Sequence, residues 1–292
     1  MKMSGAKMVI ESLHQEGVEV VFGYPGGAIM NVYDEIYKQN YFEHILNRHE
    51  QACVIAAEGY ARSTGKTGVA IVTSGPGFTN AITGIADAYM DSIPVVIISG
   101  QVPTTIIGTD GFQEIDAVGI SRPCTKHNYL VNKIEDLPRI IKEAFHLAST
   151  GRPGPVHVDI PKDITAQIGD FIYPSEVSMP TYKPTINYNK RQLKKAMEAI
   201  SNAKKPLLYI GGGAILSNCG YEIRDLAKKL NIPAVETLMA RGVMGDENPL
   251  FFGMLGMHGE YAANMAAYES YLLISLGARF DDRVTGRLDE FA

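Results

Sequence analysis

Two patterns of apolar and polar residues alternate along the first half of the chain. Short runs that are apolar at nearly every position, such as GVAIVT at 68–73, are typical of parallel strands buried on both faces. Longer segments with helix signals separate them, beginning with one that Ser4 can cap. The expected strands are residues 18–22, 44–47, 68–73, 94–99 and 155–160, and the expected helices are residues 4–13, 28–37, 50–62, 74–89 and 137–148. This alternation predicts an α/β domain over residues 1–165, a parallel sheet with helices on both faces.

The pattern fades over residues 166–189, where prolines accumulate, and we expect a linker there. A second α/β pattern then covers residues 190–292. Its expected helices are residues 190–202, 221–230 and 260–268, and its expected strands are residues 206–210, 233–236 and 271–276. A doubly wound domain that stops after its third clear strand is incomplete, so we expect this middle domain, and the chain, to be truncated.

Composition narrows the class of protein. The 292 residues are 46% hydrophobic and 20% charged, without the long apolar stretch of a membrane span or the start of a secretory signal. A net charge of −5 gives no reason to expect nucleic acid or an anionic membrane as partner. The cysteines Cys53, Cys124 and Cys219 are widely spaced, which predicts neither disulfides nor a zinc site and favours a cytoplasmic protein.

Glu50 is the first candidate for chemistry. It lies where an expected strand passes into an expected helix, at the carboxyl edge of the sheet, where open α/β sheets bind ligands. By position alone, however, a glutamate in a first helical turn is more often a surface residue favoured by the helix dipole.

Two glycine-rich turns flank Glu50 in the sequence. They are Tyr24-Pro25-Gly26-Gly27 and Ser74-Gly75-Pro76-Gly77, the second followed by Asn80. Each alone is a common turn. Together, their glycines would let the backbone approach a neighbouring group closely, which a Cβ atom would block.

In order and spacing, these turns, the triplet Arg48-His49-Glu50 and the segment AEGYAR at 57–62 resemble the pyrimidine-binding domain of thiamin-diphosphate enzymes. The resemblance implies that Glu50 hydrogen-bonds the N1′ atom of the cofactor in a partly dry pocket and takes part in general acid–base catalysis relayed through the cofactor. It also implies that Tyr24, Pro25, Gly26, Gly27, Pro76 and Asn80 contact thiamin diphosphate.

The loop at residues 99–114 and the segment KHNYLV at 126–131 narrow the resemblance to the acetolactate synthase family. Carried over, Gln113 would contact the cofactor-bound intermediate, and Pro103 and Phe112 would line the substrate channel. Gly111 stands where alanine is expected, and Thr104-Thr105 where basic residues are frequent. Without the resemblance, the alternative for this loop is a solvated surface segment, although its mixed apolar and polar content over a long span mildly favours a functional role.

The remaining candidates rest on the same resemblance. In GRPGP at 151–155, Arg152 would reach a flavin nucleotide, and Lys162 would lie near the active-site entrance. The flavin contacts implied in the second domain are Gly211, Gly212, Gly213, Thr237, Leu238, Met257, His258, Gly277, Arg279 and Asp281. Arg283 would hold the carboxylate of the second 2-keto acid. Taken alone, three glycines after a strand are a weak signal, and Asp281-Asp282 would be a helix cap or surface charge, not a metal site.

The implied enzyme is a carboligase that decarboxylates pyruvate and joins the two-carbon unit to pyruvate or 2-ketobutyrate in branched-chain amino-acid biosynthesis. It would use thiamin diphosphate, Mg²⁺ and a structural FAD, and would work as a homodimer or tetramer, with a regulatory small subunit as a further implied partner. The family's Gly-Asp-Gly…Asn segment for Mg²⁺ and diphosphate does not occur here, so we expect those ligands outside this segment and no turnover by the fragment alone. The alternatives are a pyruvate oxidase-like flavin enzyme and a non-catalytic truncated nucleotide-binding module.

Overall fold

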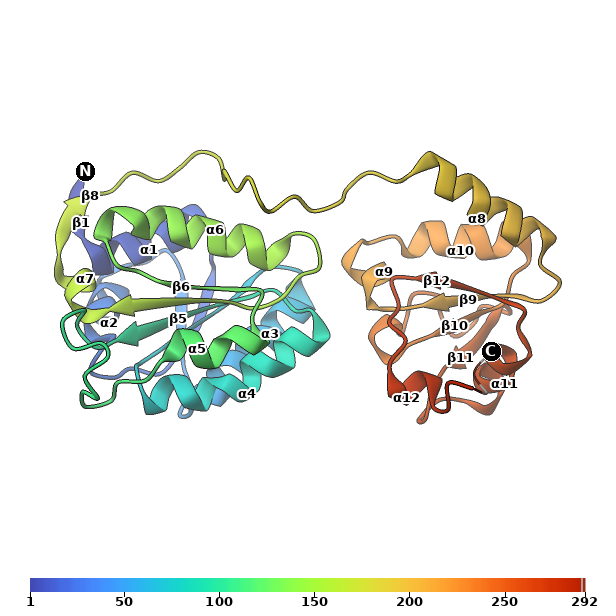
Figure 1. Cartoon of the computed structure of the whole chain (residues 1–292), viewed down its shortest axis with the longest axis horizontal. Helices are drawn as coiled ribbons and strands as arrows, with labels where there is room; N and C mark the ends of the chain where they lie inside the picture. Colours follow the sequence, from blue (N-terminus) through green and yellow to red (C-terminus); the bar gives the residue numbers. More distant parts are fainter. Residues whose placement is uncertain (290, 292) are drawn as a thin grey trace. The chain divides into compact units, whose positions relative to one another are not determined.

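The computed structural model describes residues 1–289 and 291, so two residues of the expected second domain, 290 and 292, lie outside the described residues. The chain forms two compact units, Met1–Ile186 and Asn187–Ala292, which are treated separately below (Figure 1).

Unit 1 is built on a six-stranded sheet with the order β3-β2-β4-β5-β7-β6, in which every pairing is parallel. The strands are β2 (Val20–Gly23), β3 (Glu43–Leu46), β4 (Gly68–Val72), β5 (Val95–Gln101), β6 (His127–Leu130) and β7 (Val156–Pro161). Side chains alternate across the sheet: Val69 and Ile71 of β4 enter one hydrophobic core, whereas Ala70 and Val72 enter the other. The predicted parallel sheet with two covered faces is confirmed.

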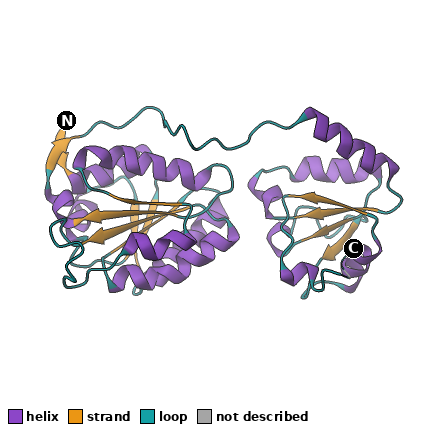
Figure 2. Ribbon diagram, viewed as in Figure 1, coloured by secondary structure: helices purple, strands orange, loops and turns teal. Residues whose placement is uncertain are grey.

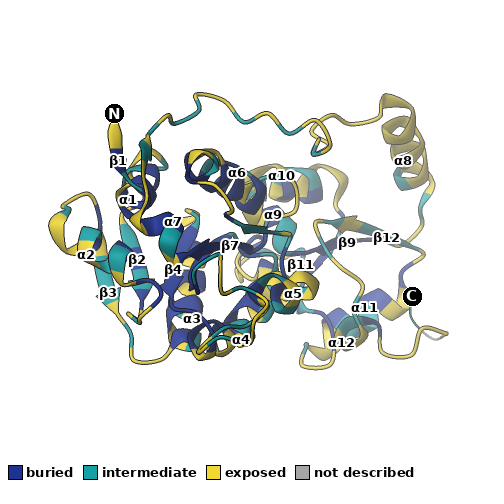
Figure 3. Ribbon diagram, turned by 60° about the vertical axis from the view of Figure 1, so that its left-hand side comes forward, coloured by how far each residue is buried: buried dark blue, intermediate teal, exposed yellow. Residues whose placement is uncertain are grey.

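Helices cover both faces of this sheet (Figure 2). α1 and α6 pack in one core and α3 and α4 in the other, and the buried residues follow the strands (Figure 3). The helices are α1 (Gly5–Gln15), α2 (Met30–Lys38), α3 (Glu50–Thr64), α4 (Pro76–Asp91), α5 (Ala117–Ser121), α6 (Leu137–Ser149) and α7 (Lys162–Ala166). As predicted, Ser4 caps α1, its side chain accepting a hydrogen bond from the backbone N–H of Lys7 at 3.2 Å.

Several short helices and strands of unit 1 were not predicted from the sequence patterns. β1 (Lys2–Ser4) pairs antiparallel with β8 (Ile168–Asp170), so the start of the segment predicted as a linker forms a second small sheet. Edge strand β6 and the short helices α5 and α7 were also not predicted. Strands of three or four residues and helices of five contain too few positions to show a period.

Unit 2 has a four-stranded sheet with the order β11-β10-β9-β12, again all parallel. Its elements are α8 (Lys190–Asn202), β9 (Pro206–Ile210), α9 (Gly212–Leu216), α10 (Gly220–Leu230), β10 (Ala234–Glu236), β11 (Phe251–Met254), α11 (Tyr261–Glu269), β12 (Leu272–Leu276) and α12 (Asp282–Thr285). The sequence analysis found three strands here and missed β11, whose pairing is broken by an irregularity between Ala234 and Glu236. None of the described helices of either unit combines the length and apolar character needed to cross a bilayer.

Candidate functional site

The start of helix α3 fixes the position of Glu50. β3 ends at Leu46, and α3 begins at Glu50 after His49, whose ring nitrogen accepts a hydrogen bond from the backbone N–H of Gln51 at 3.2 Å. The helix then runs back against the sheet, which leaves Glu50 at the carboxyl ends of the strands. Glu50 is only 6% exposed, so the surface-residue alternative is wrong for this side chain.

The first turn of α4 meets the Glu50 carboxylate. Asn80 donates a hydrogen bond from Nδ2 to Glu50 Oε2 at 3.0 Å. A Cβ atom placed on Gly77 would lie 3.1 Å from Glu50 Oε1 and 2.6 Å from Thr73 Cγ2. Because Gly77 has no side chain, the backbone at the start of α4 can come this close to the carboxylate.

Thr73 joins the two glycine-rich turns, a role that the sequence analysis missed. A Cβ atom on Gly26 would lie 2.4 Å from Thr73 Cγ2, and the backbone N–H of Ala28 donates to Thr73 Oγ1 at 3.3 Å. The turn at residues 24–27 is also tied to the sheet, since the N–H of Tyr24 donates to the carbonyl of Ile71 at 3.2 Å. Thr73 follows the last residue of β4, a position at the carboxyl edge that could have marked it.

The loop that follows β5 lies against the second glycine-rich turn. A Cβ atom on Gly75 would lie 2.5 Å from the carbonyl oxygen of Gln113, and the φ angle of Gly75 is +54°. Within the loop, an alanine Cβ at Gly111 would lie 2.3 Å from Ile106 Cγ2, which accounts for glycine there. Phe112 is 89% exposed in this chain. Of the predicted loop residues, Gln113 is therefore the one whose backbone the structure brings to the site.

Two other predicted residues of unit 1 lie apart from each other. Lys162 is exposed and begins α7 after β7, on the same carboxyl edge as Glu50. Arg152 precedes β7 and donates from Nε to Ser92 Oγ at 2.7 Å, at the opposite, amino edge. Its predicted contact with a flavin nucleotide remains a prediction.

A buried polar network lies beneath the loop. Ser99 Oγ lies 2.5 Å from Asp159 Oδ1 and 2.7 Å from His157 Nε2, and Ser121 Oγ lies 3.0 Å from His157 Nδ1. If Ser99 donates to Asp159, Nε2 carries the proton of a neutral imidazole and Nδ1 accepts from Ser121. Phe78 stacks on the His157 ring with centroids 4.2 Å apart.

Burial shifts the pKa values of this network in opposite senses. It lowers the pKa of His157 from 6.5 to about 3. It raises the pKa of Asp159 from 3.8 to about 7, against hydrogen bonds from Ser99 and Gln101 that lower it. In both groups, loss of water disfavours the charged form.

We therefore expect the His157 ring to be neutral at pH values where an exposed histidine is protonated. The unfolded chain takes up this proton below pH 6.5 and the folded chain only near pH 3, so the stability due to His157 is lost as pH falls through that window. Asp159 acts oppositely: its contribution is complete below pH 3.8 and lost as pH rises towards 7. NMR signals of the ring between about pH 4 and pH 8, assigned with His157→Gln, isolate the histidine. A midpoint near the ordinary value would contradict the expectation.

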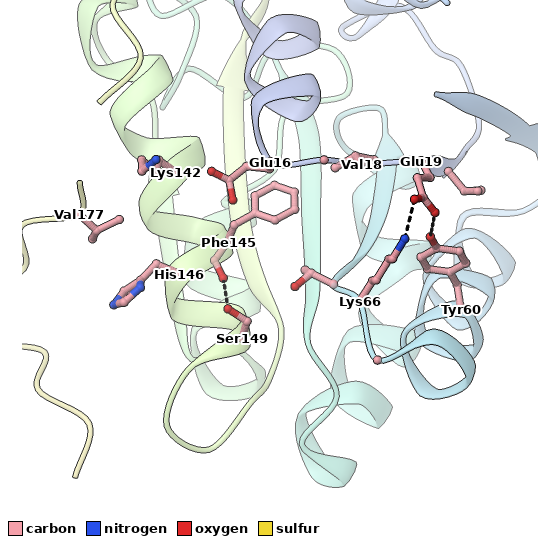
Figure 4. Close-up of a pocket in the computed structure, with 14 residues that line it drawn as sticks. Glu16, Val18, Glu19, Tyr60, Lys66, Lys142, Phe145, His146, Ser149 and Val177 are labelled. Atoms are coloured by element: carbon pink, nitrogen blue, oxygen red, sulfur yellow. Dashed lines mark hydrogen bonds and ion pairs between the residues drawn. The ribbon is translucent and has the colours of Figure 1, made fainter. Parts of the chain in front are cut away.

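A cavity of about 540 Å³ in unit 1 is a separate feature (Figure 4). It lies at the amino ends of β2 and β4 and is lined by Glu16, Glu19, Tyr60, Lys66, Lys142 and His146, among others. Glu19 accepts hydrogen bonds there from Lys66 at 2.5 Å and from Tyr60 at 3.3 Å. Glu50 and the glycine-rich turns follow the carboxyl ends of strands, so this cavity is not the candidate site.

In unit 2, the predicted residues gather at the carboxyl ends of the four parallel strands. A Cβ atom on Gly211 would lie 2.3 Å from Ala278 Cα, and one on Gly213 would lie 2.8 Å from Gly277 Cα. A Cβ atom on Gly212 would lie 3.0 Å from Met239 Cβ. The turns after β9, β10 and β12 are thus in close contact.

The same edge carries the other predicted residues of unit 2. The backbone N–H of Met257 donates to the carbonyl of Arg283 at 2.7 Å, and the backbone carbonyl of Arg279 accepts a hydrogen bond from the hydroxyl of Tyr209 at 2.8 Å. Asp281 caps α12 by accepting from the N–H groups of Arg283 and Val284, which confirms the capping alternative. Leu238, Met257, His258 and Arg283 are exposed.

Comparison with known proteins shows the family to which this sequence is similar. The family model described as thiamine pyrophosphate enzyme, N-terminal TPP binding domain, matches residues 3–120, and the model of the central domain matches residues 193–292. The chain belongs to the thiamine pyrophosphate enzymes. The first match contains Glu50 and both glycine-rich turns, and the second contains the edge of unit 2 described above.

Individual relatives are more specific. The chain is 54% identical to the acetolactate synthase large subunit of Haemophilus influenzae over 294 aligned positions, which cover 99% of this chain and 51% of that protein. It is 51% identical to the isozyme 3 large subunit of Escherichia coli K12, with 99% and 51% covered, and 52% identical to the acetolactate synthase of Mycobacterium leprae, with 100% and 47% covered. The chain thus spans about half the length of the curated relatives it matches.

Proposed function

We propose that this chain supplies the pyrimidine-binding and central domains of an acetolactate synthase catalytic subunit. The enzyme would decarboxylate pyruvate and join the remaining two-carbon unit to pyruvate or 2-ketobutyrate, as a step of branched-chain amino-acid biosynthesis. The observation that carries the proposal is the buried Glu50 carboxylate, held by Asn80 beside backbone that has no side chains at Gly26 and Gly77.

These residues fit thiamin diphosphate. When bound, the cofactor would supply the carbon acid and the electron sink for decarboxylation. Glu50 Oε2 is engaged by Asn80, so Oε1 is the oxygen with which the protein would exchange a proton with the N1′ atom. Burial of Glu50 keeps water from competing for that proton. Gly26 and Gly77 let the two turns pack on Thr73 beside Glu50, and a Cβ atom on Gly27 would meet nothing within 4 Å, which leaves space for a flat ring. Tyr24, Pro25 and Pro76 would complete the cradle.

On the substrate side, we propose that Gln113 contacts the reacting group and that Pro103 and Phe112 line the entry for the 2-keto acid, with Lys162 nearby. Gln113 would donate hydrogen bonds from its amide. Phe112, exposed here, offers an apolar surface for the methyl or ethyl group of the 2-keto acid. Arg283 of unit 2 would bind the carboxylate of the second 2-keto acid through its guanidinium fork.

Unit 2 fits a structural FAD. Close packing of the turn at residues 211–213 on Gly277 presents backbone rather than side chains, and Thr237 Oγ1 is buried without a partner among the described residues. A nucleotide would satisfy that hydroxyl. Leu238, Met257, His258, Arg279 and Asp281 would line the flavin. A contact of Arg152 with a flavin nucleotide, implied by the family resemblance, is a separate proposal.

Mg²⁺ would be held outside this chain segment. Among the described residues, no group of three or more His, Cys, Asp and Glu side chains could hold a metal ion. Because the chain spans about half the length of the relatives it matches, we propose that the 292-residue chain alone forms no acetolactate. The active assembly would be a cytoplasmic homodimer or tetramer, with a regulatory small subunit as a further partner.

The test uses the longer protein that contains this chain, supplied with thiamin diphosphate, Mg²⁺ and FAD. We expect acetolactate to form from pyruvate without oxygen uptake, and none to form with residues 1–292 alone. Pyruvate consumption coupled to oxygen uptake would instead indicate the oxidase alternative, and absence of both would refute the proposal.

A further inference from the structure

The loop between β5 and α5 holds an uncommon backbone conformation. Asp110 and Gln113 have φ angles of +58° and +59°, in the left-handed region that residues other than glycine rarely adopt. Such backbone conformations are strained and persist where the surrounding structure fixes them. The contacts that fix this loop, which carries Pro103, Phe112 and Gln113, are hydrogen bonds at both of its ends and within it.

The first attachment is at the beginning of the loop. Asp163, the second residue of α7, accepts two hydrogen bonds from Thr104: one from the backbone N–H at 3.0 Å and one from Oγ1 at 2.6 Å. These hydrogen bonds to Thr104 lower the pKa of Asp163 despite partial burial. The carboxylate is thus ionised at neutral pH, and both bonds are charge-assisted. Thr104 is one of the two positions where this sequence departs from the basic residues expected in the family.

The second attachment is at the end of the loop. The side-chain amide of Gln101 donates to the carbonyl of Ile115 at 2.9 Å and to Asp159 Oδ2 at 2.9 Å. Gln101 is 3% exposed and Asp159 is 1% exposed. Buried hydrogen bonds of this kind are costly to break, because each partner would be left unsatisfied.

Between the two attachments, the loop is braced internally. The carboxylate of Glu114 accepts hydrogen bonds from the backbone N–H groups of Gly108 and Gly111. These bonds close the turn directly before Phe112 and Gln113, and they lower the pKa of Glu114. The carbonyl of Gln113 then packs against Gly75, which belongs to the same turn as Gly77, the glycine beside Glu50.

We propose that Thr104 and Gln101 are positioning residues that clasp both ends of the loop to the β7–α7 segment and hold Gln113 in a preformed place over Gly75. The two acceptors, Asp159 and Asp163, stand on either side of Lys162 in the sequence. The loop and Lys162 are therefore carried by one rigid segment and keep a fixed spacing. The expected effect on catalysis rests on the proposed function, whereas the ordering of the loop does not.

The test compares Thr104→Val, which removes the hydroxyl, with Thr104→Ser, which keeps it. Amide hydrogen exchange of residues 104–115 is measured in the 292-residue chain. Loss of one charge-assisted hydrogen bond predicts about tenfold faster exchange in the valine variant. The serine variant should exchange like the wild type, and exchange of β5 and β7 should be unchanged in both.

Gln101→Met tests the second clasp, and Ser121→Ala is its matched control, because Ser121 belongs to the same buried network without touching the loop. We expect faster exchange near Ile115 in the methionine variant alone. Unchanged exchange in Thr104→Val, or equal acceleration in the valine and serine variants, would overturn the proposal even if Gln101→Met fails to fold.

In the longer enzyme, Thr104→Val should lower kcat/KM for pyruvate about tenfold, whereas Thr104→Ser should keep the wild-type value. If the wild-type enzyme makes no acetolactate, the proposed function fails, yet the exchange result still decides whether the clasps exist. If loop exchange accelerates and kcat/KM does not change, the positioning role is refuted and the proposed function stands.

Discussion

Glu50→Gln in the longer, cofactor-supplied protein is expected to lower the rate of acetolactate formation by about 10²–10⁴-fold. The amide has nearly the same shape as the carboxyl group, and its oxygen can still accept the hydrogen bond from Asn80. It cannot exchange a proton with the cofactor ring. The variant should therefore fold normally and lose the chemical step rather than the site's architecture. Steady-state kinetics with pyruvate measure the effect.

Glu43→Gln is the matched control, because Glu43 is exposed at the first residue of β3, at the amino edge of the sheet and away from the site. It should leave the rate within a factor of about two, as expected of surface substitutions. If Glu50→Gln turned over as fast as this control, general acid–base catalysis through Glu50 would be excluded.

Phe78→Ala should lower the free energy of unfolding of unit 1 by about 3–5 kcal/mol. The ring is fully buried in the core between the sheet and α3 and α4, and it stacks on His157 at 4.2 Å. Alanine would leave a cavity beside the polar network and remove an aromatic contact. Tyr37→Ala is the control: Tyr37 is 92% exposed, so its loss should change stability by about 0.5 kcal/mol or less.

The measurement must separate the two units, because a chain with two compact units need not unfold in one transition. The chain has no tryptophan and 15 tyrosines, so its fluorescence would mix both units. Exchange of the most protected amides of β5 reports the opening of unit 1 alone. Equal protection in Phe78→Ala and Tyr37→Ala would contradict the expected contribution of the buried Phe78 ring to the stability of unit 1.

Much of this architecture could be predicted because burial leaves a strong pattern. β4 and β5 are buried at every position, and α8 begins and ends at the predicted residues, Lys190 and Asn202. Local signals also placed Glu50 at the start of α3. The function of the turns at residues 24–27 and 74–77 could not be derived from their glycines alone and came from their resemblance to a family.

The rest depends on contacts between distant residues. Thr73 lies between two turns that are about 50 positions apart in the sequence, and Thr104 reaches Asp163 across 59 positions. The Ser99–Asp159 contact spans 60 positions. No period or local motif marks such pairs, since each residue type is common in loops and strand ends. β11 was missed because its four residues include Gly253, a residue that weakens the strand pattern.

The pairing of β5 with β7 also limits how unit 1 can fold. In the observed register, Ser99 is opposite Asp159 and Ile97 is opposite His157, while Val156, Val158 and Ile160 face the aliphatic core on the other side of the sheet. A slip of β7 by one position would turn every side chain to the other face. His157 and Asp159 would then lie among aliphatic groups without partners. The buried polar groups of β5 and β7 thus disfavour a shifted register of β7, which purely apolar strands would allow.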